Sequence, residues 1–180
     1  MKLWKILSKA VRGWNAILRG HANWREYFTL STPGLVTAIL IYLLADFLAV
    51  AFASLSIGLP SVPGVMAAMV VLALPIVAFV ATLFGSRAML KSDQALLPVL
   101  VPGVYALTAF LFIEGILAMV GGPIVMLAWA GLAYLLFRLL RAATDWNSGI
   151  ASSCAVFTVV LLVALRLALY MLSSSAGIAP

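Results

Sequence analysis

Three ionisable residues of this 180-residue chain lie well inside long apolar runs, away from their ends: Asp46, Glu114 and Arg166. A charge at the centre of a bilayer costs about 3 kcal/mol on insertion scales, so each of these residues needs a partner, water or an interface. Ionisable residues in such places form ion pairs between helices or mark pathways for protons and cations. The three residues are therefore the candidate intramembrane polar cluster.

The distances of these residues from the ends of their runs predict which of them pair. At 1.5 Å per residue, Glu114 and Arg166 lie about 10 Å and about 9 Å inside the same end of their runs. Asp46 lies about 16 Å inside its run, close to the middle. We expect Glu114 to pair with Arg166, and Asp46 to lie within reach of the long guanidinium arm.

Two interpretations of this cluster stay open at the level of sequence. In the first, the charges orient the helices and are shielded by packing, or Arg166 extends outward beside Tyr170. In the second, a carboxyl near the middle of the membrane binds and releases protons or cations, as in transport proteins. We favour the first, because three ionisable residues are few for a transporter and no pair of spans has Gly/Pro breaks in repeat-related positions.

Motifs for enzyme chemistry are absent from the sequence. No glycine-rich phosphate loop and no HExxH, GxSxG or CxxC motif occurs. His21 is the only histidine, and Cys154, the only cysteine, opens an apolar run and is interpreted as a buried apolar residue. We therefore predict that the protein has no catalytic residues, no metal site and no cofactor, and that it is not an enzyme.

The elements that position the cluster are the apolar runs themselves. Hydrophobic residues make up 66% of the chain and the mean hydropathy is +1.21, which fits a protein surrounded largely by lipid. Five runs reach the length of about 20 residues that a helix needs to cross a bilayer. They are 33–57, 63–84, 96–120, 123–140 and 150–172. The predicted fold is an all-α, polytopic integral membrane helical bundle with five transmembrane helices.

Basic residues outside the spans fall on alternate sides of the predicted membrane. Six lie in the segment 1–30 and two in each of the loops after the second and fourth spans, whereas the loops after the first and third spans carry no charge. Short loops with Lys and Arg stay cytoplasmic. We expect a cytoplasmic segment at 1–30, a transmembrane domain at 31–172 and a non-cytoplasmic tail at 173–180, in the inner membrane of a bacterium.

The N-terminal segment has the pattern of an amphipathic helix. Its basic and aromatic residues are those expected of a helix lying at the lipid headgroups. They are Lys2, Trp4, Lys5, Lys9, Arg12 and Trp14. Two roles stay open, an anchor that fixes topology and a docking surface. We expect anionic lipid headgroups as its partner, and no nucleic acid, because the charges adjoin a membrane span.

Two further features concern helix packing. Ala45, Ala49 and Ala53 form a stripe of small residues on the first span, which allows a second helix to approach closely. Whether that helix belongs to this chain or to another subunit stays open. Pro75 is expected to kink the second span, because proline removes a backbone hydrogen bond, and Gly85 is expected to close it.

The second half of the chain resembles the bacterial members of the Yip1-type family of five-span membrane proteins. The resemblance covers Asp93-Gln94-Ala95, Pro98, Pro102, Gly121-Gly122 and Leu132–Leu136, and the plan of five closely spaced spans after a cytoplasmic amphipathic segment. The family's aspartate–leucine–tyrosine–glycine–proline signature is not present. The resemblance implies a membrane-organising or scaffold role without established chemistry.

These observations together predict a non-enzymatic integral membrane protein that acts by helix association, as an accessory subunit or scaffold. We expect its partners to be other membrane subunits or further copies of itself. The alternative is a small transporter or channel component that uses Asp46 and Glu114 with Arg166.

Overall fold

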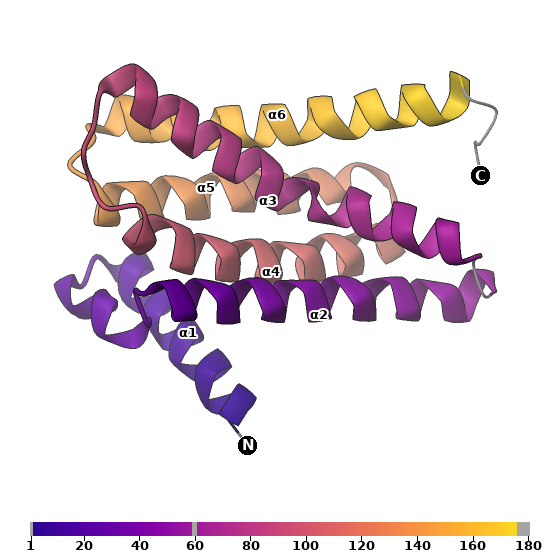
Figure 1. Ribbon diagram of the computed structural model, residues 1–180, viewed down its shortest axis with the longest axis horizontal. Helices are drawn as coiled ribbons and strands as arrows, with labels where there is room; N and C mark the ends of the chain where they lie inside the picture. Colours follow the sequence, from indigo (N-terminus) through magenta and orange to yellow (C-terminus); the bar gives the residue numbers. More distant parts are fainter. Residues whose placement is uncertain (1, 59–60, 176–180) are drawn as a thin grey trace.

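The structure is a computed structural model that describes residues 2–58 and 61–175, and the described chain is all-helical (Figure 1). A helix at the N-terminus, α1, is followed by a short 3-10 helix, η1, and then by the long helices α2 to α6. Their bounds are α1 Lys2–Arg19, η1 Ala22–Tyr27, α2 Thr32–Ile57, α3 Val62–Leu90, α4 Leu97–Val120, η2 Gly122–Ile124, α5 Val125–Ala143 and α6 Ser148–Ser175. Five of these helices are long and apolar enough to cross a membrane, which confirms the predicted fold class.

Serine residues begin the first two spans in the same way. The side chain of Ser31 accepts a hydrogen bond from the backbone N–H of Gly34, and that of Ser61 from Gly64, each at 3.3 Å. A proline lies in the first turn of each helix, where its missing N–H leaves no bond unmade. Both spans therefore start where the sequence predicted, within a residue.

The end of the second span was predicted wrongly. Gly85 does not close it: α3 continues through this residue to Leu90 and ends at Lys91, which adopts the left-handed conformation at φ 48°. A glycine inside a helix costs only about 1 kcal/mol, which the surrounding turns offset. The side chain of Arg87 closes the helix end instead, because its Nε donates to the carbonyl of Ser92 at 2.8 Å. The predicted span 63–84 therefore omitted the last turns of α3.

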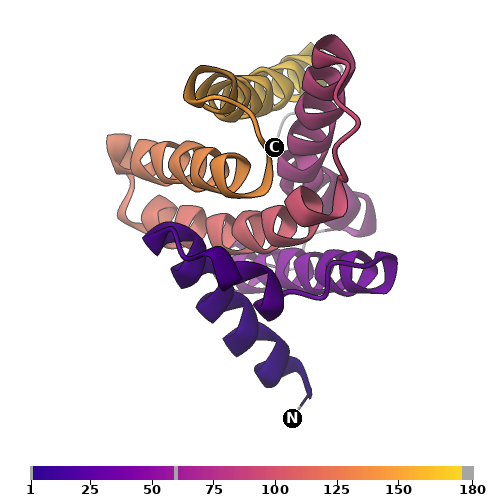
Figure 2. The same cartoon turned by 90° about the vertical axis from the view of Figure 1, so that its left-hand side faces the viewer.

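Four of the long helices run side by side, and α3 crosses them obliquely (Figures 1 and 2). α4 packs against α2 and α5, whereas α6 packs against α3 and α5. The α3–α4 and α5–α6 connections and α1 lie at one end of the bundle, at the left of Figure 1. We call this the basic end, because Arg87, Lys91, Arg138 and Arg141 lie there with the N-terminal segment.

The N-terminal helix docks on the basic end of the bundle through one face. Ala10, Gly13 and Ile17 are buried. A Cβ at Gly13 would lie 2.4 Å from the ring of Phe28, so only glycine allows this close approach. The indole N–H of Trp14 donates to the carbonyl of Pro102 in α4 at 3.1 Å.

The other faces of α1 are exposed and separate into an apolar and a basic side. Leu3, Trp4, Leu7 and Val11 are exposed on one flank, and Lys5, Lys9 and Arg12 on the other. This division is the one that a helix lying between lipid and water requires. The side chain of Lys2 lies outside the described residues.

The alanine stripe of the first span is buried at one end and exposed at the other. Ala45 is buried, Ala49 is half-buried and Ala53 is exposed. Pro75 lies inside α3, as expected from the sequence. One turn before it, the carbonyl of Leu72 accepts a hydrogen bond of 2.5 Å from the hydroxyl of Tyr42 in α2, which joins α2 to α3 at this point.

Candidate functional site

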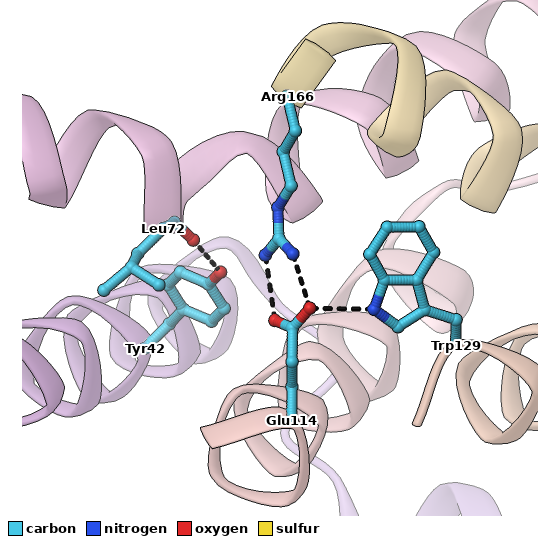
Figure 3. A network of polar contacts seen from close by, with 5 residues as sticks. All are labelled: Tyr42, Leu72, Glu114, Trp129 and Arg166. Atoms are coloured by element: carbon cyan, nitrogen blue, oxygen red, sulfur yellow. Dashed lines mark hydrogen bonds and ion pairs between the residues drawn. The ribbon is translucent and has the colours of Figure 1, made fainter. Parts of the chain in front are cut away.

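The predicted ion pair between Glu114 and Arg166 is present and joins α4 to α6 (Figure 3). Arg166 Nη1 donates to Glu114 Oε1, and Nη2 donates to Oε2 at 2.9 Å. Two parallel N–H···O bonds of this kind are the strongest geometry available to a carboxylate and a guanidinium. The outward extension of Arg166 beside Tyr170, the alternative at the level of sequence, is not the arrangement observed.

A tryptophan that sequence reasoning missed completes this site. The indole N–H of Trp129 in α5 donates to Glu114 Oε1 at 2.8 Å, and its ring centroid lies 5.7 Å from Arg166 Cζ. Glu114 lies seven residues before Gly121, and Trp129 lies seven residues after Gly122, so the two residues are equally distant from this tight turn. Residues placed symmetrically about such a turn lie at the same depth on adjacent helices, and this signal was available in the sequence.

The ion pair links helices that do not form a main packing contact with each other. α5 lies between α4 and α6 and contacts both. The side chains of Arg166 and Glu114 are 20% and 11% exposed, so the pair is largely removed from the surroundings of the bundle. Because Trp129 lies on α5, the three side chains hold α4, α5 and α6 at one depth.

Asp46 forms no hydrogen bond with the Glu114–Arg166 pair. Its side chain is fully buried in α2, and neither carboxyl oxygen has a hydrogen-bond partner within residues 2–58 and 61–175. The expectation that Arg166 would reach Asp46 therefore fails at the level of hydrogen bonds: Arg166 Nη1 and Nη2 bond to Glu114, and Arg166 Nε is buried without a hydrogen-bond partner among the described residues. Tyr42, one turn away on α2, donates its hydroxyl to Leu72 instead. A buried polar group without a partner is costly, so Asp46 needs an explanation.

Two cavities lie elsewhere in the bundle. A cavity of about 410 Å³ lies at the basic end, between the C-terminal ends of α1 and α5. A groove of about 1030 Å³ lies between α3 and α6. Neither is lined by Asp46, Glu114 or Arg166. The candidate cluster thus lies outside both of these cavities.

Residues that ligate metals are scattered. Over the described part of the chain, no three His, Cys, Asp or Glu residues are grouped closely enough to hold a metal ion. Cys154 is buried near the start of α6, as expected.

Comparisons with known proteins leave the family open. No protein-family model, curated protein or solved structure matches this chain. The Yip1-type resemblance therefore stays a prediction. What is established is the architecture: a bundle with five helices of membrane-spanning length and composition, in which a buried ion pair joins two of them.

Proposed function

We propose that this protein is a non-enzymatic scaffold or accessory subunit of a membrane assembly, and that it works by helix association. The observation that supports this proposal best is the groove between α3 and α6. It lies on the side of the bundle away from α1, where α3 and α6 lie together in Figure 2. We propose that a transmembrane helix of a partner subunit occupies it.

The walls of the groove have the composition of a helix-packing surface. Ala81, Gly85 and Ser86 line it from α3, and Gly149 and Ser152 line it from α6. Small residues allow two backbones to approach closely. Because helices in lipid have no hydrophobic driving force for association, close packing of this kind drives it instead. The groove contains no charged side chain, which suits an apolar partner helix.

Thr82 lines the groove, but its hydroxyl is buried within this chain. Thr82 is 2% exposed and its Oγ1 has no hydrogen-bond partner within the described residues. Polar side chains bond across helix interfaces in membranes, and buried polar groups are nearly always satisfied. Because its own chain covers Thr82 Oγ1, a partner helix in the groove would not reach this oxygen, and the small residues of the walls carry the proposal.

The closed ion pair supports a structural role over transport. Glu114 accepts hydrogen bonds from both Arg166 and Trp129, so its carboxylate is occupied within the chain. A transport site needs a carboxyl that is open to a path for the ion. We infer that the pair orients α4, α5 and α6 and thereby presents α6 to the partner.

The distribution of Lys and Arg supports a proposal for the orientation of the bundle. We propose that the basic end faces the cytoplasm of a bacterial cell and that the protein lies in the inner membrane. Every Lys and Arg outside the spans belongs to that end. Short basic loops are retained on the cytoplasmic side.

The test is purification of the tagged full-length protein from native membranes in mild detergent, with mass and co-purifying subunits read together. We expect a stoichiometric companion with at least one transmembrane helix. Gly85→Leu fills the groove and should lower the yield of the companion by at least tenfold. Gly131→Leu is the matched control, because both glycines have open space at the Cβ position and Gly131 lies outside the groove.

Three outcomes contradict this proposal. A monomer without a companion removes association as the function. Equal loss of the companion with Gly85→Leu and Gly131→Leu removes the groove as its site. A homo-oligomer that Gly85→Leu dissociates would mean that the groove is an interface, but that its occupant is a second copy of this chain and not an accessory subunit.

A second candidate function, a transporter or channel component, is favoured by Asp46. Its buried carboxyl has no hydrogen-bond partner in the described chain, and carboxyls of this kind bind protons or cations in transport proteins. Asp46→Asn tests the candidate in proteoliposomes. Lost ion flux with unchanged assembly supports transport, whereas lost assembly or abundance supports the structural role.

A further inference from the structure

The cavity at the basic end has an apolar side and a cationic side. It lies where the C-terminal turn of α1 and the segment 20–24 meet the last turns of α5. Ile17, Trp24 and Phe137 contribute apolar surface, and Arg138 and Arg141 contribute guanidinium groups. His21 lines the same cavity. Its volume of about 410 Å³ is that of a small-ligand site.

The two arginines are held in place by the backbone, and each keeps donors free. Arg138 Nη2 donates to the carbonyls of Ile17 and Leu18 at 3.1 and 2.7 Å, at the end of α1. Arg141 Nη1 donates to the carbonyl of Trp146 at 2.7 Å. A guanidinium has five N–H donors, and within the described residues the remaining nitrogens of these two arginines bond to nothing.

No carboxylate neutralises these charges. Over the part of the chain that the structure describes, the Glu114–Arg166 contact is the one ion pair, and it lies far along the spans from the basic end. The C-terminal ends of α1 and α5 contribute a partial charge of about −0.5 each. Two guanidinium groups therefore leave the cavity with a net positive charge of about one, before any charge on His21 is counted.

We propose that this cavity binds a phosphate group through His21, Arg138 and Arg141, and that the phosphate is supplied by an anionic phospholipid or by a free phosphate compound. Arginine binds phosphate through paired N–H donors. The positions 138 and 141 lie on one face of α5, so both guanidinium groups can act on one ligand.

The apolar side of the cavity favours the lipid. α5 is a membrane-spanning helix, and its last turns are where a headgroup meets the protein. A phospholipid would lay its glycerol and upper acyl region against Ile17 and Phe137, whereas a free phosphate ion would leave that surface unused. This site is distinct from the exposed basic side of α1, since Lys5, Lys9 and Arg12 do not line it.

The test uses the full-length protein in micelles of a zwitterionic detergent, titrated with phosphatidylglycerol, phosphatidylcholine or inorganic phosphate. Bound lipid is counted by native mass spectrometry, and the unfolding midpoint is followed in parallel, because a ligand that binds the folded state raises it. We expect phosphatidylglycerol to bind at least tenfold more tightly than phosphatidylcholine. Arg141→Gln should weaken phosphatidylglycerol about tenfold, or ~1.4 kcal/mol.

Arg141 also holds the α5–α6 loop through the carbonyl of Trp146, and Arg141→Gln removes that bond. Two further variants therefore test the cavity without changing Arg141. His21→Ala removes a side chain that has no structural hydrogen bond in the described chain, and should weaken the lipid about threefold. Ala142→Leu reduces the cavity without changing any charge and should weaken it about tenfold. Lys91→Gln is the matched control, because Lys91 is an exposed positive charge at the same end that lies outside both the cavity and the basic side of α1.

Each outcome bears on the proposal. Lack of preference for phosphatidylglycerol overturns it, as does equal loss of affinity with Lys91→Gln and Arg141→Gln, since that would be general attraction to a basic surface. If Ala142→Leu leaves the binding of phosphatidylglycerol unchanged, the cavity is not the binding site. Binding of inorganic phosphate that Arg141→Gln weakens, and that displaces the lipid, keeps the phosphate site and identifies its source as a free compound.

Discussion

Neutralising one member of the Glu114–Arg166 pair is expected to destabilise the bundle more than neutralising both. Glu114→Gln keeps the size of the side chain and an oxygen that accepts from Trp129, but it removes the negative charge. It leaves the guanidinium of Arg166 unpaired about 12 Å inside the span that ends at Ser174. Arg166→Gln leaves the carboxylate of Glu114 with Trp129 as its remaining hydrogen-bond donor.

The magnitude follows from the bonds that are lost. Two charge-assisted hydrogen bonds join Arg166 to Glu114, and each contributes about 1.5–3 kcal/mol. Breaking a buried pair by removing one partner costs about 3–5 kcal/mol. The side chain of Arg166 is 20% exposed, and hydrogen bonds between membrane helices are weaker than this range assumes. Both facts favour the lower end of the range for the loss of stability. We expect each single variant to lose about 3 kcal/mol and the double variant about 1 kcal/mol, because it leaves no unpaired charge.

The assay is equilibrium unfolding of the purified full-length protein in mixed micelles, with the three variants arranged as a double-mutant cycle. Trp129→Phe is a useful companion, since it removes one bond to the carboxylate and should cost about 1.5 kcal/mol while the ion pair remains. Single variants that each cost under about 1 kcal/mol and add in the double variant would refute the reasoning. That result would mean that water or lipid headgroups already satisfy both charges.

Two other substitutions test packing by the same unfolding assay. Tyr42→Phe should cost about 1 kcal/mol by removing the bond to the Leu72 carbonyl, and no loss would mean that this carbonyl does not need the hydroxyl. Gly103→Ala should cost about 1–3 kcal/mol, because the new Cβ would lie 2.4 Å from the ring of buried Phe79. Gly131→Ala, where the Cβ position is open, should be neutral or stabilising by up to about 1 kcal/mol, and equal losses at both glycines would contradict the packing argument.

The five helices of spanning length and the Glu114–Arg166 pair were both expected from local features of the sequence. A helix in lipid satisfies its backbone hydrogen bonds within itself, so its presence depends on a local property, the length of an apolar run. Depth along a span is equally local, because the rise per residue is constant. Glu114 and Arg166 could therefore be matched before any packing was known, and the structure brings them together.

The surroundings of that pair, and the helix surfaces that stay uncovered, depend on how the helices pack. Helices that are apolar on every side carry no stripe that tells the packed face from the lipid face, so the order of the helices could not be read from periodicity. That order brings Trp129 to the carboxylate and leaves Asp46 without a hydrogen-bond partner in the described chain. It also opens the groove beside Thr82 and the cationic cavity at Arg141. Each of these depends on side chains from helices that are distant in sequence, because three-dimensional packing alone brings them into contact.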